Sequence, residues 1–276
     1  MKKLILLLTA VLLTLSLAAC GGQTEEKNRL EQIKQRGYIE VVMEPYFAPY
    51  EFIDASKSAD EQYVGVDVEI AKVIAEKLGV ELRIIPLEFG AVLAGISEGK
   101  YDLAISALAY TPARAESMNM SEGYYFGENE GYGLLVREAD KDKYKTADDL
   151  KDAVVVMQSG SIQELFVTEQ IPVAKEFKRV SATTDGFLMV SEGKADVCAC
   201  AIANGRLYAQ ANEGLAIAND FTFYFDETTQ GTRIGIPLGE TELTEFVNTV
   251  IAELRERGDI DKWYEEYEDY AASLGI

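Results

Sequence analysis

The sequence has no histidine among its 276 residues and only three cysteines. Without an imidazole, a Ser-His-Asp triad, a Cys-His pair and a histidine-ligated zinc site are all excluded. Three cysteines are too few for a disulfide framework. Cys198 and Cys200 are two residues apart in an apolar stretch, so we expect reduced core residues that face the same side of a strand. We expect no metal centre and no cofactor.

Basic residues are also scarce, because 26 Lys and Arg stand against 47 Asp and Glu, for a net charge of −21. Binding to a nucleic-acid backbone requires clustered Lys and Arg, and this balance excludes it. Solubility is a sufficient reason for the excess of acidic residues.

The apolar run from Leu4 to Leu17 is too short for a membrane helix, which needs about 20 apolar residues. Two lysines precede this run, and it ends in Leu17-Ala18-Ala19-Cys20-Gly21. A basic start, a short apolar segment and small residues before a cysteine are typical of a lipoprotein signal peptide over residues 1–20. The alternative is an ordinary cleavage site with an incidental cysteine.

Cleavage at this site would make Cys20 the lipid-modified N-terminus of the mature chain. Two acyl chains suffice for stable anchoring, so we expect an extracytoplasmic protein held on the cell membrane. Loss of the two signal lysines lowers the basic count from 26 to 24 and gives a net charge of −23. Residues 21–28 form a polar linker, and the remaining chain is long enough for two lobes.

Strand and helix patterns alternate along the chain and predict an α/β fold with parallel sheets. Short apolar runs or alternating segments predict strands, and apolar residues at helical spacing predict helices. The predicted strands are 39–43, 80–84, 103–108, 154–157 and 197–202. The predicted helices are 68–78, 89–98, 162–170, 187–192, 243–254 and 260–267.

One short segment occurs twice. Ser97-Glu98-Gly99-Lys100-Tyr101-Asp102-Leu103 recurs as Ser191-Glu192-Gly193-Lys194-Ala195-Asp196-Val197. In both copies a predicted helix stops at glycine and a strand begins after the turn. The repeat indicates that each of two lobes uses the same helix–turn–strand unit.

Polar segments follow the carboxyl ends of four predicted strands: 44–50 and 106–114 in the first lobe, and 158–163 and 201–206 in the second. Ligands of open α/β sheets bind beyond these strand ends. Two lobes that present them to each other would form a cleft between them.

Several of these segments resemble motifs of the polar amino-acid solute-binding proteins, the type 2 periplasmic binding proteins of family 3. The ordered set is Pro49-Tyr50-Glu51-Phe52, Gly65-Val66-Asp67-Val68-Glu69-Ile70-Ala71, Gly99-Lys100-Tyr101-Asp102, Thr111-Pro112-Ala113-Arg114 and Gln158-Ser159-Gly160-Ser161-Ile162-Gln163-Glu164. The resemblance extends from residue 30 to residue 267. It implies a two-lobed Venus-flytrap fold with two hinge strands, in which residues 29–126 and 231–276 form lobe 1 and residues 127–230 form lobe 2.

The resemblance also implies that Arg114 holds the α-carboxylate of the ligand. A guanidinium independently suits this role, because its planar fork matches a carboxylate with two hydrogen bonds. The loop before the predicted helix at residue 162 offers backbone N–H groups to the same carboxylate, or serves only as a helix cap. From these segments we select Ser106, Ala107, Ala109, Gln158, Ser161, Ile162 and Ala201 as further ligand-binding candidates.

Aromatic and acidic residues complete the candidate site. Phe47, Tyr50 and Tyr124 are candidate walls for the ligand side chain, or ordinary core residues. Glu44 occupies the position where relatives carry an acid that binds the distal polar group of the ligand. An acid there favours an amide, amine or guanidinium, unless Glu44 is merely a solvated loop residue.

Two positions depart from the family pattern. Ala109 stands where a hydroxyl residue is usual, and Ala201 stands where an aspartate usually pairs with the α-ammonium group. The loss of such a charged partner is worth about 1.5–3 kcal/mol. Another acid substitutes for it, with Glu44, Glu130 and Asp226 as candidates, or the ligand is not a standard α-amino acid. Asn204 is a neutral alternative acceptor.

The motifs together predict a monomeric binding protein without enzymatic activity. We expect it to capture a small polar amino acid or amino-acid-like carboxylate by lobe closure and to deliver it to an ABC permease. One alternative is an enzyme on the same fold that resembles cyclohexadienyl dehydratases, with Glu44 as the general acid. A sensory receptor domain is the other alternative.

Overall fold

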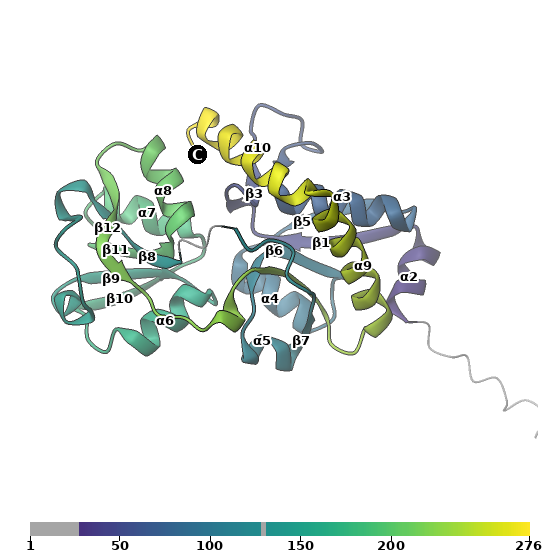
Figure 1. Cartoon of the computed structure of the whole chain (residues 1–276), viewed down its shortest axis with the longest axis horizontal. Helices are drawn as coiled ribbons and strands as arrows, with labels where there is room; N and C mark the ends of the chain where they lie inside the picture. Colours follow the sequence, from purple (N-terminus) through teal and green to yellow (C-terminus); the bar gives the residue numbers. More distant parts are fainter. Residues whose placement is uncertain (1–27, 128–130) are drawn as a thin grey trace, which may run out of the picture.

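The computed structural model describes residues 28–127 and 131–276 (Figure 1). The predicted signal peptide, Cys20 and all but the last residue of the predicted linker lie outside the described residues, as does Glu130. Across the described part of the chain, no helix combines the length and the apolar character needed to cross a membrane.

The fold has two lobes, each built on its own five-stranded sheet (Figure 1). In lobe 1 the strand order is β5-β1-β6-β13-β7. These strands are β1 (Tyr38–Met43), β5 (Glu81–Pro86), β6 (Leu103–Ala109), β7 (Met118–Met120) and β13 (Thr232–Pro237). A small sheet of β2 (Tyr46–Phe47), β3 (Glu51–Ile53) and β4 (Tyr63–Val64) lies beside it. The helices of this lobe are α2 (Arg29–Arg36), α3 (Val66–Leu78), α4 (Phe89–Ser97), α5 (Pro112–Ser117), α9 (Thr241–Arg257) and α10 (Asp259–Leu274).

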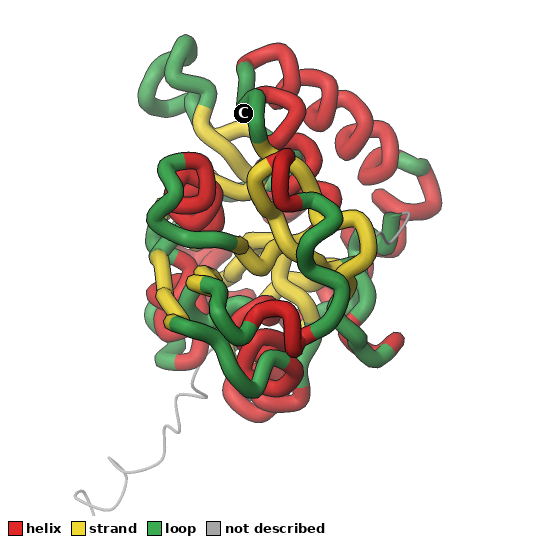
Figure 2. The backbone as a smooth tube through the Cα atoms, turned by 90° about the vertical axis from the view of Figure 1, so that its left-hand side faces the viewer, coloured by secondary structure: helices red, strands yellow, loops and turns green. Residues whose placement is uncertain are grey.

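In lobe 2 the strand order is β10-β9-β11-β8-β12. The strands are β8 (Tyr132–Arg137), β9 (Val154–Gln158), β10 (Glu176–Val180), β11 (Val197–Ala201) and β12 (Leu215–Thr222). The helices are α6 (Ile162–Gln170), α7 (Thr183–Ser191) and α8 (Ile202–Ala211), with short 3-10 turns at Glu138–Asp140, Ala147–Leu150 and Glu227–Thr229. Figure 2, which views the molecule from the lobe 2 side, shows helices in red around the yellow strands.

The prediction of parallel sheets is correct for one half of each sheet, from the edge strand β5 or β10 to the central strand, and wrong for the other half. Strand β1 is parallel to β5 and β6, and β9 is parallel to β10 and β11. By contrast, β13 is antiparallel to β6, and β8 is antiparallel to β11. Strands β6 and β11 end at the cleft, whereas the chain enters β8 and β13 from the cleft, so these neighbours must run in opposite directions.

The two crossings between the lobes are joined to each other. Tyr125 and Thr232 form an isolated antiparallel bridge, in which the Thr232 N–H donates to the Tyr125 carbonyl at 2.9 Å. The Tyr124 N–H donates to the Thr232 carbonyl at 2.9 Å. The predicted lobe boundaries at residues 126/127 and 230/231 stay predictions.

Apolar side chains cover both faces of each sheet because successive strand residues point to opposite sides. In β1, Val41 belongs to the core beneath α3 and α9, while Val42 belongs to the core beneath α4. In β9, Val155 and Val156 divide in the same way between two cores of lobe 2. Cys198 and Cys200 are free thiols in one of these cores, as predicted.

The repeated segment forms the same turn in both lobes. Helices α4 and α7 end at Ser97 and Ser191, and the following Gly99 and Gly193 adopt the left-handed conformation, which glycine tolerates best.

The aspartate of each repeat then ties its strand to the neighbouring strand. Asp102 accepts a hydrogen bond from the Glu40 N–H of β1, and Asp196 accepts one from the Val154 N–H of β9, both at 2.8 Å. Each aspartate also pairs with arginine: Asp102 with Arg29 and Arg36, and Asp196 with Arg137.

The C-terminal helix α10 contacts both lobes. Its residues Ile260, Trp263 and Tyr264 pack on the lobe 1 core. Farther along the helix, Ala271 shares an apolar cluster with Leu207 of α8 in lobe 2. Figure 1 shows the end of α10, in yellow, beside α8.

Candidate functional site

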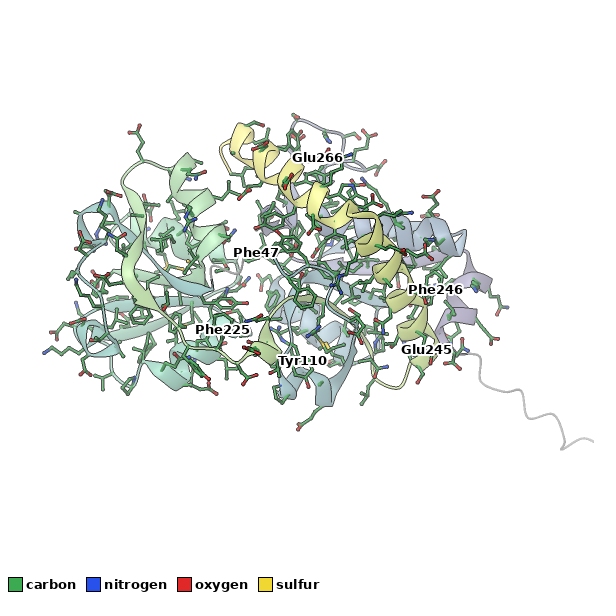
Figure 3. The ribbon with its side chains drawn as sticks, viewed as in Figure 1. Phe47, Tyr110, Phe225, Glu245, Phe246 and Glu266 are labelled. Carbon is green, nitrogen blue, oxygen red and sulfur yellow. The ribbon has the colours of Figure 1, made fainter. Side chains whose placement is uncertain are left out.

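A cavity of about 440 Å³ lies between the lobes, where the carboxyl ends of β1, β6, β9 and β11 meet. Phe47 from lobe 1 and Phe225 from lobe 2 lie on opposite sides of this cleft (Figure 3). The structure brings together all eleven ligand-binding candidates on its walls: Glu44, Phe47, Tyr50, Ser106, Ala107, Ala109, Arg114, Gln158, Ser161, Ile162 and Ala201.

Arg114 is the buried cation of the cleft. It lies in the short helix α5, which Thr111 caps by accepting a hydrogen bond from the Arg114 N–H. The residue is 8% exposed, and its guanidinium donates to the Ala109 carbonyl at 2.7 Å and to the Gly160 carbonyl of lobe 2 at 3.1 Å. Within residues 28–127 and 131–276, it forms no salt bridge with a carboxylate.

Burial lowers the pKa of Arg114 to about 10. The side chain therefore stays protonated at neutral pH. These two hydrogen bonds use only part of a guanidinium that carries five N–H donors. A buried cation without a paired anion is unfavourable, and an anionic ligand in the cavity would compensate it.

The beginning of α6 forms the lobe 2 wall opposite Arg114. Ser161 is its N-cap: the hydroxyl accepts from the Glu164 N–H and donates to the Gln158 carbonyl at 2.7 Å. This hydroxyl is therefore engaged in capping. The first backbone N–H groups of α6, at Ile162 and Gln163, belong to residues that line the cavity. A helix start favours an anion at this position.

Three buried carboxyl groups, those of Glu44, Glu51 and Asp67, lie on the lobe 1 side of the cleft. The contacts of Glu51 and Asp67 show a structural role for two of the motifs noted in the sequence. Glu51 accepts a hydrogen bond from the Ser106 hydroxyl at 2.7 Å. Asp67 accepts from the Tyr124 hydroxyl at 2.6 Å and from the Ala107 N–H at 2.8 Å.

Burial, with the neighbouring charge of Asp67, raises the pKa of Glu51 well above its usual value. Glu51 is therefore the member of the pair that stays protonated, and its Oε2 has no hydrogen-bond partner among the described residues. Asp67 in turn holds Ala107 in its left-handed conformation at φ 45°, which is unfavourable for a residue with a Cβ.

Glu44 is the third carboxyl group and lies at the seam between the lobes. It is buried, and its Oε1 has no hydrogen-bond partner among the described residues. Burial, reinforced by the charge of Asp185, raises the pKa of Glu44 to about 8. At neutral pH Glu44 is therefore mainly in its neutral form.

Aromatic rings form the rest of the cleft wall. Phe47 and Tyr50 stack with their ring centroids 5.9 Å apart. The proposal of Tyr124 as a wall is wrong: its side chain is buried in the lobe 1 core, and its hydroxyl donates to Asp67. Its neighbour Tyr125 lines the cavity instead and stacks on Tyr264 of α10 at 4.3 Å.

Some lining residues were missed by the sequence analysis. Phe89 at the start of α4 lies under the Arg114 guanidinium, 5.5 Å from ring centroid to Cζ. Tyr132 and Phe225 of lobe 2 contact each other edge to face. A strand-end rule could have located Phe89, because it follows the carboxyl end of β5.

The two unusual alanines, Ala109 and Ala201, both line the cavity and contribute no polar side-chain group. Among the acids considered as substitutes, Asp226 is exposed and caps a turn through the Thr228 N–H, away from the cleft lining. Glu130 lies outside the described residues. Asn204 lines the cavity and donates from Nδ2 to the Ala48 carbonyl of lobe 1 at 3.1 Å. The described residues contain no group of three acidic or cysteine side chains suited to a metal ion.

Comparison with known proteins shows which proteins this chain resembles. The chain is 26% identical to the arginine-binding extracellular protein ArtP of Bacillus subtilis (strain 168), over 95% of this chain and 96% of that protein. Its structure is similar to that of the L-arginine-bound amino acid ABC transporter substrate-binding protein AbpA from Streptococcus pneumoniae Canada MDR_19A. That comparison has a TM-score of 0.79 and 31% identity, and covers 88% of this chain and 98% of the other.

A second similar structure is that of the ancestral amino-acid-binding protein AncCDT-1, a precursor of cyclohexadienyl dehydratase. It has a TM-score of 0.75 and 26% identity, over 87% of this chain and 99% of that chain. The sequence model of the bacterial extracellular solute-binding proteins, family 3, matches residues 39–269. With this match over most of its length and a two-lobed fold around a polar cleft, the chain belongs to family 3 of the bacterial extracellular solute-binding proteins.

Proposed function

We propose that this protein captures a small amino acid or amino-acid-like carboxylate between its lobes and delivers it to an ABC permease. The observation that carries the proposal is the unpaired, buried guanidinium of Arg114 in the cleft. A carboxylate is the chemical group that best satisfies its planar donors. The relatives ArtP and AbpA, which bind arginine according to their names, support an amino acid as the ligand.

Both lobes contribute to the proposed carboxylate site. Arg114 comes from lobe 1, and the N-terminal end of α6 comes from lobe 2. The bond from Arg114 to the Gly160 carbonyl already joins the two sides. A carboxylate held by both would favour the closed arrangement, because it gains its second set of donors only when the lobes meet.

Glu44 is proposed to bind the distal polar end of the ligand. Its unpartnered Oε1 offers an acceptor to an amide, amine or guanidinium. Phe47 and Tyr50 would contact the apolar part of the ligand between the two polar ends.

The proposed location follows from the predicted signal sequence. Cleavage before Cys20 and lipid attachment would keep a monomeric protein on the outer side of the cell membrane, near its permease. Expression with a radiolabelled fatty acid tests this location: label is expected on the wild-type protein and absent from a Cys20→Ser variant.

A thermal-shift screen of the mature protein against amino acids tests the function. A ligand at 100 times its Kd stabilises the fold by about 2.7 kcal/mol, which gives a clear shift in Tm. L-arginine and L-argininamide form an informative pair, because the amide lacks the carboxylate. We expect shifts with amino acids and none with the amide. Equal shifts from L-arginine and L-argininamide would contradict the carboxylate site.

The dehydratase alternative is supported by one observation beyond the likeness to AncCDT-1. The raised pKa of Glu44 keeps this carboxyl group protonated at neutral pH, as a general acid requires. We nevertheless propose binding without turnover. An assay with prephenate and arogenate tests this, and measurable product formation that a Glu44→Gln variant loses would favour the enzyme.

A further inference from the structure

Asn204 is the buried amide of the lobe 2 wall. It lies in the first turn of α8, three residues after Ala201, which ends β11 and is the N-cap of this helix. Its side chain lines the cavity, and the residue is only 7% exposed.

The orientation of this amide follows from its contact with lobe 1. The Ala48 carbonyl lies 3.1 Å from Nδ2 and can only accept a hydrogen bond. The NH2 group must therefore face Ala48, because the opposite orientation would bring two oxygens together. The carbonyl oxygen Oδ1 is left buried, with no hydrogen-bond partner among the described residues.

A buried amide oxygen without a donor is unfavourable, so a cavity that contains one is suited to a ligand that supplies an N–H. Two other described lining residues of lobe 2, Ala201 and Gln158, are weak competitors for such an N–H. Ala201 has no polar side-chain atom, and the Gln158 side chain already bonds Ser181 and Thr183.

We propose that Oδ1 of Asn204 accepts the N–H group carried next to the carboxylate of the ligand, in place of the carboxylate group missing at Ala201. This assignment rests on the proposed function. It deepens that function in one respect: lobe 2 recognises the ligand nitrogen through a neutral dipole rather than through a charge. The ligand class is then a small carboxylate with an N–H on its α-carbon.

The same amide links ligand binding to closure. When Oδ1 accepts a hydrogen bond, the amide is polarised and its N–H donors become stronger. The Nδ2 bond to Ala48 crosses from lobe 2 to lobe 1, so an occupied Oδ1 strengthens a contact between the lobes.

The test uses two pairs of probes that differ only in the α-amine: L-arginine with des-amino-arginine, and L-glutamine with glutaric acid monoamide. Isothermal titration calorimetry on the whole mature protein gives the Kd of each. The measured quantity is the ratio of the des-amino Kd to the amino-acid Kd. A purely structural effect of Asn204 on closure weakens both members of a pair equally and leaves this ratio unchanged.

We expect a wild-type ratio of about ten for the pair that binds, from one hydrogen bond to a charged donor. In Asn204→Ala the ratio should fall to about one, and in Asn204→Asp it should rise above the wild-type value. Asn212→Ala is the matched control, because Asn212 ends the same helix and donates from Nδ2 to the Tyr208 carbonyl, outside the cavity lining. Its ratio should equal that of the wild type.

Two results would overturn the assignment in different ways. If an amino acid binds but the ratio is the same in wild type and Asn204→Ala, Asn204 is not the acceptor and the proposed function stands. If the wild-type protein binds none of the four probes, the proposed capture of amino-acid-like carboxylates fails, and the Asn204 assignment fails with it.

Discussion

The two lobes contain the same structural unit and differ in the chemistry that follows it. In each lobe a helix, a glycine turn and an aspartate lead into the central strand, and the aspartate binds the backbone of the neighbouring strand. Beyond the strand ends, lobe 1 presents ionisable side chains to the cleft: Glu44, Glu51 and Arg114. Lobe 2 presents neutral polar side chains: Gln158, Ser161 and Asn204.

This difference divides two tasks between the lobes: lobe 1 holds the charged groups, and lobe 2 covers the ligand. Lobe 1 holds its charges in a fixed network of hydrogen bonds before a ligand arrives. Lobe 2 can cover the ligand without dehydrating charged side chains of its own. Dehydration of a buried ion has a large free-energy cost. The comparison therefore predicts that changes of charge have different effects in the two lobes.

The twin aspartates provide the largest expected difference. Asp102 is completely buried between two arginines, whereas Asp196 is 30% exposed beside Arg137. Asp102→Ala removes a fully buried carboxylate with its hydrogen bond to the Glu40 N–H and its two arginine pairs, and should lower the free energy of unfolding by about 3–5 kcal/mol. Asp196→Ala should lower it by about 1 kcal/mol, because water screens that pair. Urea unfolding followed by circular dichroism measures both; equal losses would show that the two turns are equivalent in energy.

Arg114→Ala should have the largest effect on binding. Removal of the cation leaves the ligand carboxylate without its partner, with an expected loss of about 2–5 kcal/mol in binding free energy. Calorimetry with the best amino acid from the screen measures this loss. Arg83→Ala is the control, because Arg83 lies on β5 with an exposed side chain that pairs with Glu81. Unchanged affinity in Arg114→Ala would place the carboxylate elsewhere in the cleft.

Ala201→Asp places a charge in the neutral lobe and thus tests the asymmetry directly. If the α-ammonium group of the ligand lies near this wall, a carboxylate should improve the affinity for L-arginine about tenfold, the value of one charge-assisted bond. The affinity for des-amino-arginine should not improve. Ala201→Asn controls for size without adding charge. Improvement of both probes would show that the change acts on closure rather than on the amine.

Ionisation of Glu44 should have a smaller effect on the affinity for L-arginine, and this effect should depend on pH. Its pKa of about 8 means that roughly nine-tenths of the groups are protonated at pH 7 in the empty cleft. A guanidinium bound at Glu44 favours the ionised form, so L-arginine binding should release most of one proton. Affinity should then rise as pH increases towards 8 and level off above it.

Calorimetry in phosphate and in Tris detects this proton, because the two buffers differ in their heats of ionisation. The binding heat should depend on the buffer in the wild type but not in Glu44→Gln. Heats that are identical in both buffers for the wild type would mean that the distal cation does not reach Glu44.

Much of the fold was predictable because its central elements have strong patterns. Residues 162–170 were predicted as a helix with the bounds that the structure shows. Helix α8 was missed, because Asn204 and Gly205 are poor helix formers. The structure supplies the reason for Gly205: a Cβ there would lie 2.7 Å from the Cys200 sulfur. Such a tertiary contact cannot be read from local propensity.

The candidate site was predicted as a set of positions and not as a network. Strand-end reasoning found Arg114 and Ser106, and the structure places both on the cavity wall. The sequence also contained Glu51 and Asp67, in motifs that supported the resemblance. Their contacts were not predictable, because Glu51 and Asp67 come from different segments and each binds a neighbouring residue at the end of β6, Ser106 or Ala107.

The contact of α10 with α8 affects the kinetics of a protein that opens and closes as proposed. Separation of the lobes would expose Leu207 and Ala271, which are almost fully covered in the closed form. Exposure of apolar area costs about 25 cal/mol per Å². In a protein that opens as proposed, this cost would favour the closed arrangement with or without a ligand and would slow the release of a captured molecule.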